Sequence, residues 1–290
     1  MRFLAYNKDM AREPAVHSRL KEQRRKRRAI VIYFSIFLLL AGITAVVLVI
    51  RLPSLRISAI DATGSETIAT STIAEFAWHD LSGDYWFVIP KDSILFYPRQ
   101  QLQADTLAAF APLQSALVRS DSFTKISVTV AERHPSALWC GDASAAVSAT
   151  SSPQTPCLLL DQSGVAYAPA PQFSAPIYMT YYGNLPEGGA ELPVQFLTPS
   201  EFSSLSSLVG ALAQKANAGG VVSVAVDDSD DVALRFADGF LLKFSALDDA
   251  SVTLDHFSVA LSTDVFTTHA LSDFEYLDLR FGDKLYYKLK

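Results

Sequence analysis

The chain has 290 residues, of which 50% are hydrophobic, 11% aromatic and 19% charged; this composition excludes a disordered protein and leaves room for two domains of ordinary size. Its two cysteines exclude a disulfide-dense miniprotein and a four-cysteine zinc module. The net charge of −6 indicates no nucleic-acid partner, but it is unevenly spread. Residues 1–28 hold ten Lys or Arg and three Asp or Glu, a local charge of +7, which leaves −13 for the rest.

The boundary between these charges is a membrane span. Ala29 to Ile50 contains no charged residue, and as a helix it measures about 33 Å, enough to cross a bilayer. Residues 24–28 are all Lys or Arg and only Arg51 follows, which predicts a cytoplasmic N-terminus and an exported segment 51–290. A cleaved signal peptide is the alternative, but its apolar region is usually about 7–15 residues and no small-x-small cleavage site follows here. We favour a retained signal anchor. Residues 24–28 could instead be a nucleic-acid patch, but their position favours topology and anionic headgroups.

The exported segment begins with a β-α-α-β-β order. Residues 56–63 alternate as a strand and stop at a glycine. Helical spacing follows over 68–81 and, more weakly, over 98–110. Residues 114–119 and 125–132 predict two strands, and in the second Ile126, Val128 and Val130 share one face.

After Pro135 the pattern changes to short strands and turns. Strands are predicted at 136–140, 157–161, 165–167, 221–226, 232–236 and 240–244, with a last hairpin at 274–281 and 284–290. Residues 168–196 are rich in Pro and Gly and are expected to wrap the surface. A capping box at 198–201 opens one helix, and a second covers about 249–261. The fold class is therefore α+β, with a single N-terminal transmembrane helix followed by two extracytoplasmic domains.

No motif for nucleotide binding, hydrolysis or metal binding is present, and the five histidines have no zinc-type spacing. The acidic run 227–231 lacks the central glycine and distal glutamate of an EF-hand, so a solvated hairpin turn is the favoured interpretation over a calcium site. We therefore expect no metal, no cofactor, no small-molecule substrate and no enzymatic activity, although a Ser/His/Asp site cannot be recognised from sequence alone.

The two cysteines flank one predicted hairpin on the exported side. A disulfide between Cys140 and Cys157 would close a loop of about 17 residues and contribute about 3 kcal/mol by the chain-entropy argument. We favour this bond over two free thiols. A catalytic cysteine is the weakest interpretation, because no histidine lies nearby in the sequence.

Three segments carry a resemblance to a known family. Residues 130–139 read VAERHPSALW, residues 158–167 read LLLDQSGVAY and residues 276–281 read YLDLRF. They resemble, in this order, the E-R-x-P-x-A-x-W, L-D-x-x-G and Y-x-D-L-R motifs of FtsQ/DivIB, the bitopic cell-division proteins of bacteria. The resemblance covers residues 22–290. The cysteine-flanked loop 141–156 is a departure from the family pattern, and segment 84–97 is longer than usual.

The resemblance implies a basic cytoplasmic tail (1–28), a signal anchor (29–50), a POTRA domain (56–134) and an FtsQ-type mixed β domain with two helices (135–290). It implies a non-enzymatic divisome scaffold in the cytoplasmic (inner) membrane at the division septum. Such a scaffold binds FtsB-like and FtsL-like single-span proteins outside the membrane and helps regulate septal peptidoglycan synthesis.

By analogy with the family, the partner site lies on the last hairpin, at Arg280, Phe281, Leu285, Tyr286 and Tyr287. A terminal strand with an outer face rich in lysine suits pairing with an acidic partner strand. The alternative for Phe281, Leu285 and Tyr287 is a place in the core, which is also the favoured interpretation of Leu277 and Leu279.

Two other functions stay open. A POTRA-bearing component of another envelope or secretion machine is the second; such proteins usually carry tandem POTRA copies or a β-barrel, and no repeat is found here. A membrane-anchored extracytoplasmic hydrolase is the third, and it would need converging titratable groups in a pocket.

Overall fold

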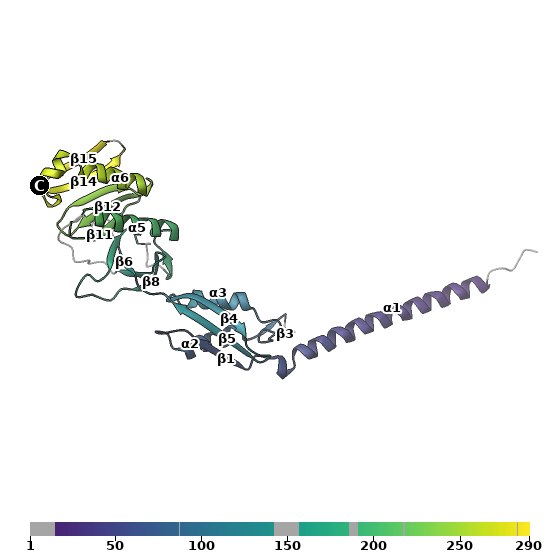
Figure 1. The fold of residues 1–290 in the computed structure, drawn as a ribbon. Helices are drawn as coiled ribbons and strands as arrows, with labels where there is room; N and C mark the ends of the chain where they lie inside the picture. Colours follow the sequence, from purple (N-terminus) through teal and green to yellow (C-terminus); the bar gives the residue numbers. More distant parts are fainter. Residues whose placement is uncertain (1–14, 87, 142–156, 186–190, 217, 283) are drawn as a thin grey trace, which may run out of the picture. The chain divides into compact units, whose positions relative to one another are not determined.

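The computed structural model describes residues 15–86, 88–141, 157–185, 191–216, 218–282 and 284–290, with side chains from residue 24 onward. The described chain is α+β, as predicted (Figure 1). It divides into two compact units. The first holds the chain up to Asp61, which includes the N-terminal helix, together with Ala74–Arg99 and Arg119–Ser127. The second holds Ala62–Ile73, Gln100–Val118 and Val128–Lys290.

The N-terminal helix α1 runs without a break from Ala15 to Ile50, 36 residues. An 18-residue window within its segment Arg24–Ile50 has a mean hydropathy of 2.7, and the segment is long and apolar enough to cross a membrane. A signal sequence has the same character. The helix therefore starts 14 residues before the predicted span and carries the basic run 24–28 on its own backbone.

The five elements predicted after the helix are all present. They are β1 (Ala59–Thr63), α2 (Thr70–Asp80), α3 (Arg99–Ala109), β4 (Leu113–Ser120) and β5 (Lys125–Glu132), preceded by the short helix η1 (Pro53–Leu55). The strands form a sheet in the order β1-β5-β4. Ile126, Val128 and Val130 are buried, as the alternation of β5 predicts. A two-stranded hairpin, β2 (Asp84–Tyr85) with β3 (Ile89–Pro90), was not predicted, because strands of two residues leave no periodic signal.

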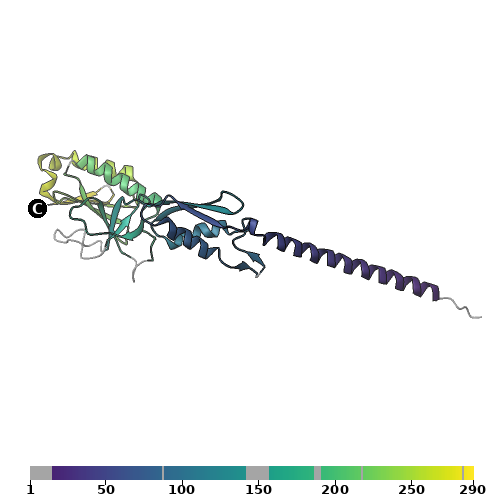
Figure 2. The ribbon, with the colours of Figure 1, turned by 90° about the horizontal axis from the view of Figure 1, so that it is seen from below.

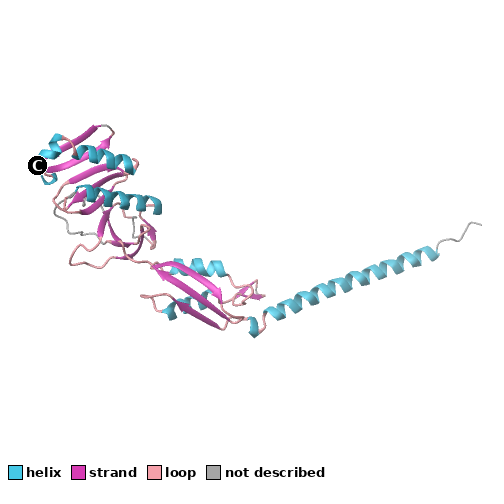
Figure 3. Ribbon diagram, in the orientation of Figure 1, coloured by secondary structure: helices cyan, strands magenta, loops and turns pink. Residues whose placement is uncertain are grey.

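The rest of the chain builds one ten-stranded mixed sheet in the order β10-β8-β7-β6-β9-β11-β12-β13-β14-β15. Figure 3 draws the strands in magenta and the helices in cyan. Its strands are β6 (Ala137–Cys140), β7 (Leu158–Leu160), β8 (Val165–Pro169), β9 (Met179–Tyr182), β10 (Val194–Gln195), β11 (Val221–Val226), β12 (Asp231–Phe236), β13 (Leu241–Ser245), β14 (Phe274–Phe281) and β15 (Lys284–Leu289). Neighbours pair antiparallel except β6 with β9, β9 with β11, and β13 with β14.

Helices cover one face of this sheet (Figure 2). They are α5 (Pro199–Ala216) and α6 (Ala250–Leu261), followed by the short α7 (Asp264–Thr268) and η2 (Leu271–Asp273). The predicted capping box starts α5: the Glu201 amide donates to Thr198 Oγ1 at 3.3 Å, and the Thr198 amide donates to Glu201 Oε2 at 3.0 Å. Leu205, Leu208 and Leu212 of α5 enter the same core as the inward side chains of the strands.

The prediction for residues 168–196 was wrong at β9. Instead of wrapping the surface, Met179–Tyr182 lies in the middle of the sheet, between β6 and β11. Tyr181 packs among core residues including Phe202, whereas Tyr182 lies on the opposite face beside Cys140. A short strand that is covered on both faces and parallel to both neighbours has no polar–apolar alternation to detect.

Candidate docking edge on the terminal strand

Strand β15 is the last strand of the ten-stranded sheet and pairs only with β14 among the strands that the structure describes. Its other side therefore presents a row of backbone N–H and C=O groups that can pair with an additional strand. The opposite end of the sheet is β10, which has only two residues. The long edge of the sheet is therefore the one at β15.

The five predicted partner residues all lie on the β14–β15 hairpin. Phe281 is 54% exposed, Tyr286 49% and Tyr287 42%, while Leu285 is half-buried. Their side chains divide between the two faces of the hairpin. Leu285 packs against the domain core, and the Tyr287 ring makes edge-to-face contacts with Phe266 and Phe274 on the helix-covered face.

Tyr286 and Phe281 form an exposed aromatic pair on the other face. Their ring centroids are 5.1 Å apart in a T-shaped arrangement. Simple alternation would have placed Phe281 with Leu277 and Leu279 on the inner face. The register of the hairpin shifts between Asp278 and Phe281, and this irregularity brings Phe281 to the Tyr286 side.

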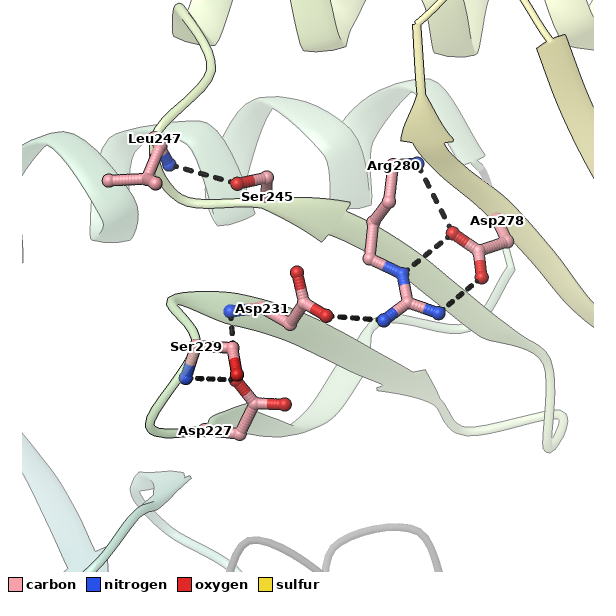
Figure 4. Close-up of polar contacts among 7 residues, drawn as sticks. All are labelled: Asp227, Ser229, Asp231, Ser245, Leu247, Asp278 and Arg280. Atoms are coloured by element: carbon pink, nitrogen blue, oxygen red, sulfur yellow. Dashed lines mark hydrogen bonds and ion pairs between the residues drawn. The ribbon is translucent and has the colours of Figure 1, made fainter.

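Arg280 lies beside Phe281 of this aromatic pair. Its guanidinium is bonded to the carboxylates of two strands of the sheet (Figure 4). Its Nε and Nη2 donate to the two carboxylate oxygens of Asp278 at 2.9 and 2.6 Å, and Nη1 donates to Asp231 Oδ2 on β12. The guanidinium therefore joins β14 to β12 across the intervening β13. Its Cζ lies 5.7 Å from the Phe281 ring centroid, a cation–π distance.

The charges of this cluster stabilise one another. Burial of Asp278 opposes its ionisation, but the hydrogen bonds and charge of Arg280 outweigh burial and lower the pKa of Asp278 below its ordinary value. The same hydrogen bonds with Asp278 raise the pKa of Arg280. We infer that Arg280 fixes the geometry of the hairpin and thereby the position of Phe281 and Tyr286.

Replacing Arg280 by Lys is expected to lower the free energy of unfolding by about 1–2 kcal/mol, because an ammonium group cannot bridge two carboxylates in this fork geometry. Amide exchange in β15 is expected to accelerate. Urea unfolding and hydrogen exchange measure the two effects. Lys288→Gln is the matched control, since the Lys288–Glu275 ion pair of 2.5 Å is exposed. Equal effects of the two substitutions would contradict a special role for Arg280.

The acidic run 227–231 is a hairpin turn between β11 and β12 in the structure. Asp227 Oδ1 accepts hydrogen bonds from the Ser229 and Asp231 amides at 2.9 and 3.0 Å (Figure 4). Within the described part of the chain, no group of three or more His, Cys, Asp or Glu side chains could hold a metal ion. The Asp227 carboxylate thus orders the backbone of the turn, and the Asp231 carboxylate accepts a hydrogen bond from Arg280.

Cys140 and Cys157 are joined by a disulfide in the structure. The Cys140 side chain is fully buried on the face of the sheet opposite the helices, beside Tyr182 and Ala225. Most of the loop between the cysteines, residues 142–156, lies outside the described residues.

The charged motif residues just before Pro135 stabilise neighbouring loops. The Glu132 carboxylate accepts a hydrogen bond from the loop before α2, and Arg133 forms an ion pair with Asp161. Asp161 Oδ1 in turn accepts hydrogen bonds from the Ser163 and Val165 amides at 2.8 and 3.0 Å. The contacts of Asp231 and Asp278 with Arg280 were not predicted from the sequence. The D-x-R spacing of Asp278 and Arg280 puts both on one strand face and could have revealed their pairing.

Comparison with protein-family models finds no match for this chain, and comparison with curated protein sequences finds no significant similarity.

Proposed function

We propose that this chain is a membrane-anchored, non-enzymatic scaffold that captures an extended segment of a partner protein along β15. The observation that carries this proposal is the side of β15 that pairs with no described strand, next to the exposed Phe281–Tyr286 pair. An added strand would gain affinity from main-chain hydrogen bonds and register from side-chain contacts with this pair.

The finer assignment follows the resemblance to FtsQ/DivIB. In it, α1 is a signal anchor with a cytoplasmic N-terminus, residues 56–134 form a POTRA domain, and residues 135–290 form the partner-binding domain. The partners are FtsB-like and FtsL-like single-span proteins, and the site of action is the division septum. The β-α-α-β-β order and the terminal hairpin support this assignment.

Charge favours an acidic segment in the partner. Lys284 and Lys288 are exposed on β15, and Lys288 has a raised pKa through its hydrogen bond and ion pair with Glu275. Lys290, just after β15, donates to the Ser272 carbonyl at 2.7 Å and is thus engaged within the domain. A partner strand carrying Glu or Asp opposite Lys284 would find complementary charge along the edge.

The proposal is tested by Tyr286→Asp in the full chain, expressed in its own cells and purified with its partners. Recovery of FtsB-like and FtsL-like proteins is expected to fall by at least about tenfold, because a charge replaces an aromatic anchor. The melting temperature is expected to change by less than about 3 °C, since Tyr286 is 49% exposed. Tyr286→Phe, which keeps the ring, is the control and should retain binding.

Site-specific photo-crosslinking separates the edge from other surfaces. A crosslinking residue at position 286 is expected to capture the partner, whereas one at Leu247, which is 78% exposed on the same unit, is not. Capture of the partner from position 247 but not from position 286 would show that the interface does not lie on β15. Recovery of neither FtsB-like nor FtsL-like proteins by the unmodified chain would refute the divisome assignment.

A further inference from the structure

The hairpin β2–β3 is attached to the end of helix α1. Arg51, the first residue after α1, donates from Nε to the Val88 carbonyl at 3.0 Å, and its Nη2 lies 3.8 Å from Asp84 Oδ2. One guanidinium thus contacts both strand β2 and the turn of the hairpin. Ile50, the last residue of α1, is 6% exposed, whereas most of the apolar helix before it is exposed. Figures 1 and 2 both show the hairpin beside this end of α1, within the same compact unit.

The tip of the hairpin holds an unusual tryptophan. Trp86 is 90% exposed, and its φ of 53° lies in the left-handed region that favours glycine or asparagine. The Val88 amide closes the turn on the Tyr85 carbonyl at 3.0 Å, and Val88 is itself 41% exposed. In water this arrangement combines backbone strain with a large exposed apolar surface, two unfavourable features at one residue.

Further exposed apolar side chains lie near the same end of the unit. Leu52, directly after α1, is 46% exposed, and Leu95 and Phe96 are 57% and 49% exposed. The Ile94 amide donates to the Leu55 carbonyl at 3.0 Å, which brings these two segments together. Exposed apolar and aromatic side chains beside a membrane span are typical of the interface between hydrocarbon and water.

We propose that the hairpin tip, with Trp86 and Val88, lies in the lipid headgroup region of the bilayer that α1 crosses. The inference rests on the proposed membrane anchor and goes beyond it. Arg51 marks the point where the uncharged stretch ends, and its guanidinium is bonded to the turn carbonyl of the hairpin. The tip is therefore held at the depth where the hydrocarbon ends, which is why lipid, and not a protein, is its partner.

The chemistry of a tryptophan side chain suits the interface between hydrocarbon and water. Its ring buries apolar area among the upper acyl chains while its indole N–H bonds to headgroup or water oxygens. The Lys91 ammonium, 5.9 Å from the Tyr85 ring centroid, adds a positive charge beside the tip that suits anionic headgroups. The hairpin would give the chain a second attachment to the membrane next to α1.

The test uses the full chain in vesicles of phosphatidylethanolamine and phosphatidylglycerol, with or without bromine atoms on the upper acyl chains. The chain has three tryptophans. Brominated lipid is expected to quench about a third of the tryptophan emission in the unmodified protein, because only Trp86 reaches the interface. Trp86→Ala is expected to abolish this quenching.

Trp78→Ala is the matched control, because Trp78 is 37% exposed on α2 in the same unit and should leave the quenching intact. Equal quenching in Trp86→Ala and the unmodified protein overturns the proposal, as does absence of quenching. A blue-shifted Trp86 emission without quenching would mean that the tip docks on protein, which also overturns it. Flotation of the vesicles at alkaline pH tests the α1 anchor separately, so failure of the anchor and failure of the hairpin contact are distinguished.

Discussion

Replacing Glu132 by Ala is expected to lower the free energy of unfolding by about 3 kcal/mol, because one buried carboxylate satisfies the whole loop that precedes α2. Glu132 is 8% exposed. Its carboxylate accepts hydrogen bonds from the amides of Glu66, Thr67 and Ile68 at 2.8, 2.9 and 3.3 Å and from the Ser65 and Thr67 hydroxyls. Urea unfolding of the two proteins at neutral pH measures the loss.

The same carboxylate predicts a pH dependence. Burial opposes ionisation of Glu132, but the hydrogen bonds from Ser65 and Thr67 outweigh it and lower the pKa to about 2, against 4.5 for the ordinary side chain. A pKa that is lower in the folded state contributes stability above pH 4.5 and loses it as the pH falls toward 2. The stability difference between the unmodified protein and Glu132→Ala is therefore expected to shrink over that range.

Glu66→Gln is the matched control for this prediction. The Glu66 side chain is exposed and only its backbone amide contacts Glu132. This variant should keep the neutral-pH stability and the pH dependence of the unmodified protein. A stability difference between Glu132→Ala and the unmodified protein that stays constant from pH 6 to about pH 2 would show that the carboxylate is not ionised through these contacts.

Replacing Gly64 by Ala is expected to be at least as damaging, with a loss of about 3 kcal/mol or more. Gly64 has a φ of +92°, and a Cβ atom added there would lie 2.1 Å from the Val130 carbonyl oxygen of β5. Both the conformation and the contact involve backbone, so no side-chain rotation relieves the clash. Urea unfolding, followed by the exchange protection of β1 and β5 amides, measures the effect.

Gly210→Ala is the matched control, because it shows whether the loss of stability in Gly64→Ala is specific to the conformation and contacts of Gly64. Gly210 lies within α5, and an added Cβ meets no atom within 4 Å. This substitution is expected to raise stability by up to about 1 kcal/mol, because alanine is the better helix former. If Gly64→Ala proved as stable as the unmodified protein, the turn after β1 would have to be looser than the structure shows.

The sequence predicted those elements whose signal is local. Strand β5 shows a regular alternation of polar and apolar residues, and the capping box of Thr198 and Glu201 marks the start of α5. The bounds of both elements were therefore predicted within one or two residues. Strand β9 was missed because its two tyrosines lie on opposite faces of the sheet and both are buried. The strand therefore shows no alternation of polar and apolar residues. The β2–β3 hairpin was missed because its strands are shorter than any period.

The candidate site was predictable in composition but not in geometry. Aromatic and basic residues on the last hairpin follow from the sequence and the family resemblance. The bond between Arg280 and Asp231 joins residues 49 positions apart, and no local pattern reports such a contact. The register shift before Phe281 reverses its face, which only the pairing of β14 with β15 reveals.

The unequal ends of the ten-stranded sheet have a consequence for stoichiometry. Of the two edge strands of this sheet, β15 has six residues, while β10 at the other end has two. A sheet with one long edge binds one extended segment there, so capture along β15 is saturable at a ratio of one to one. Once β15 is paired, the ten-stranded sheet offers no second long edge among its described strands to a further copy of the partner.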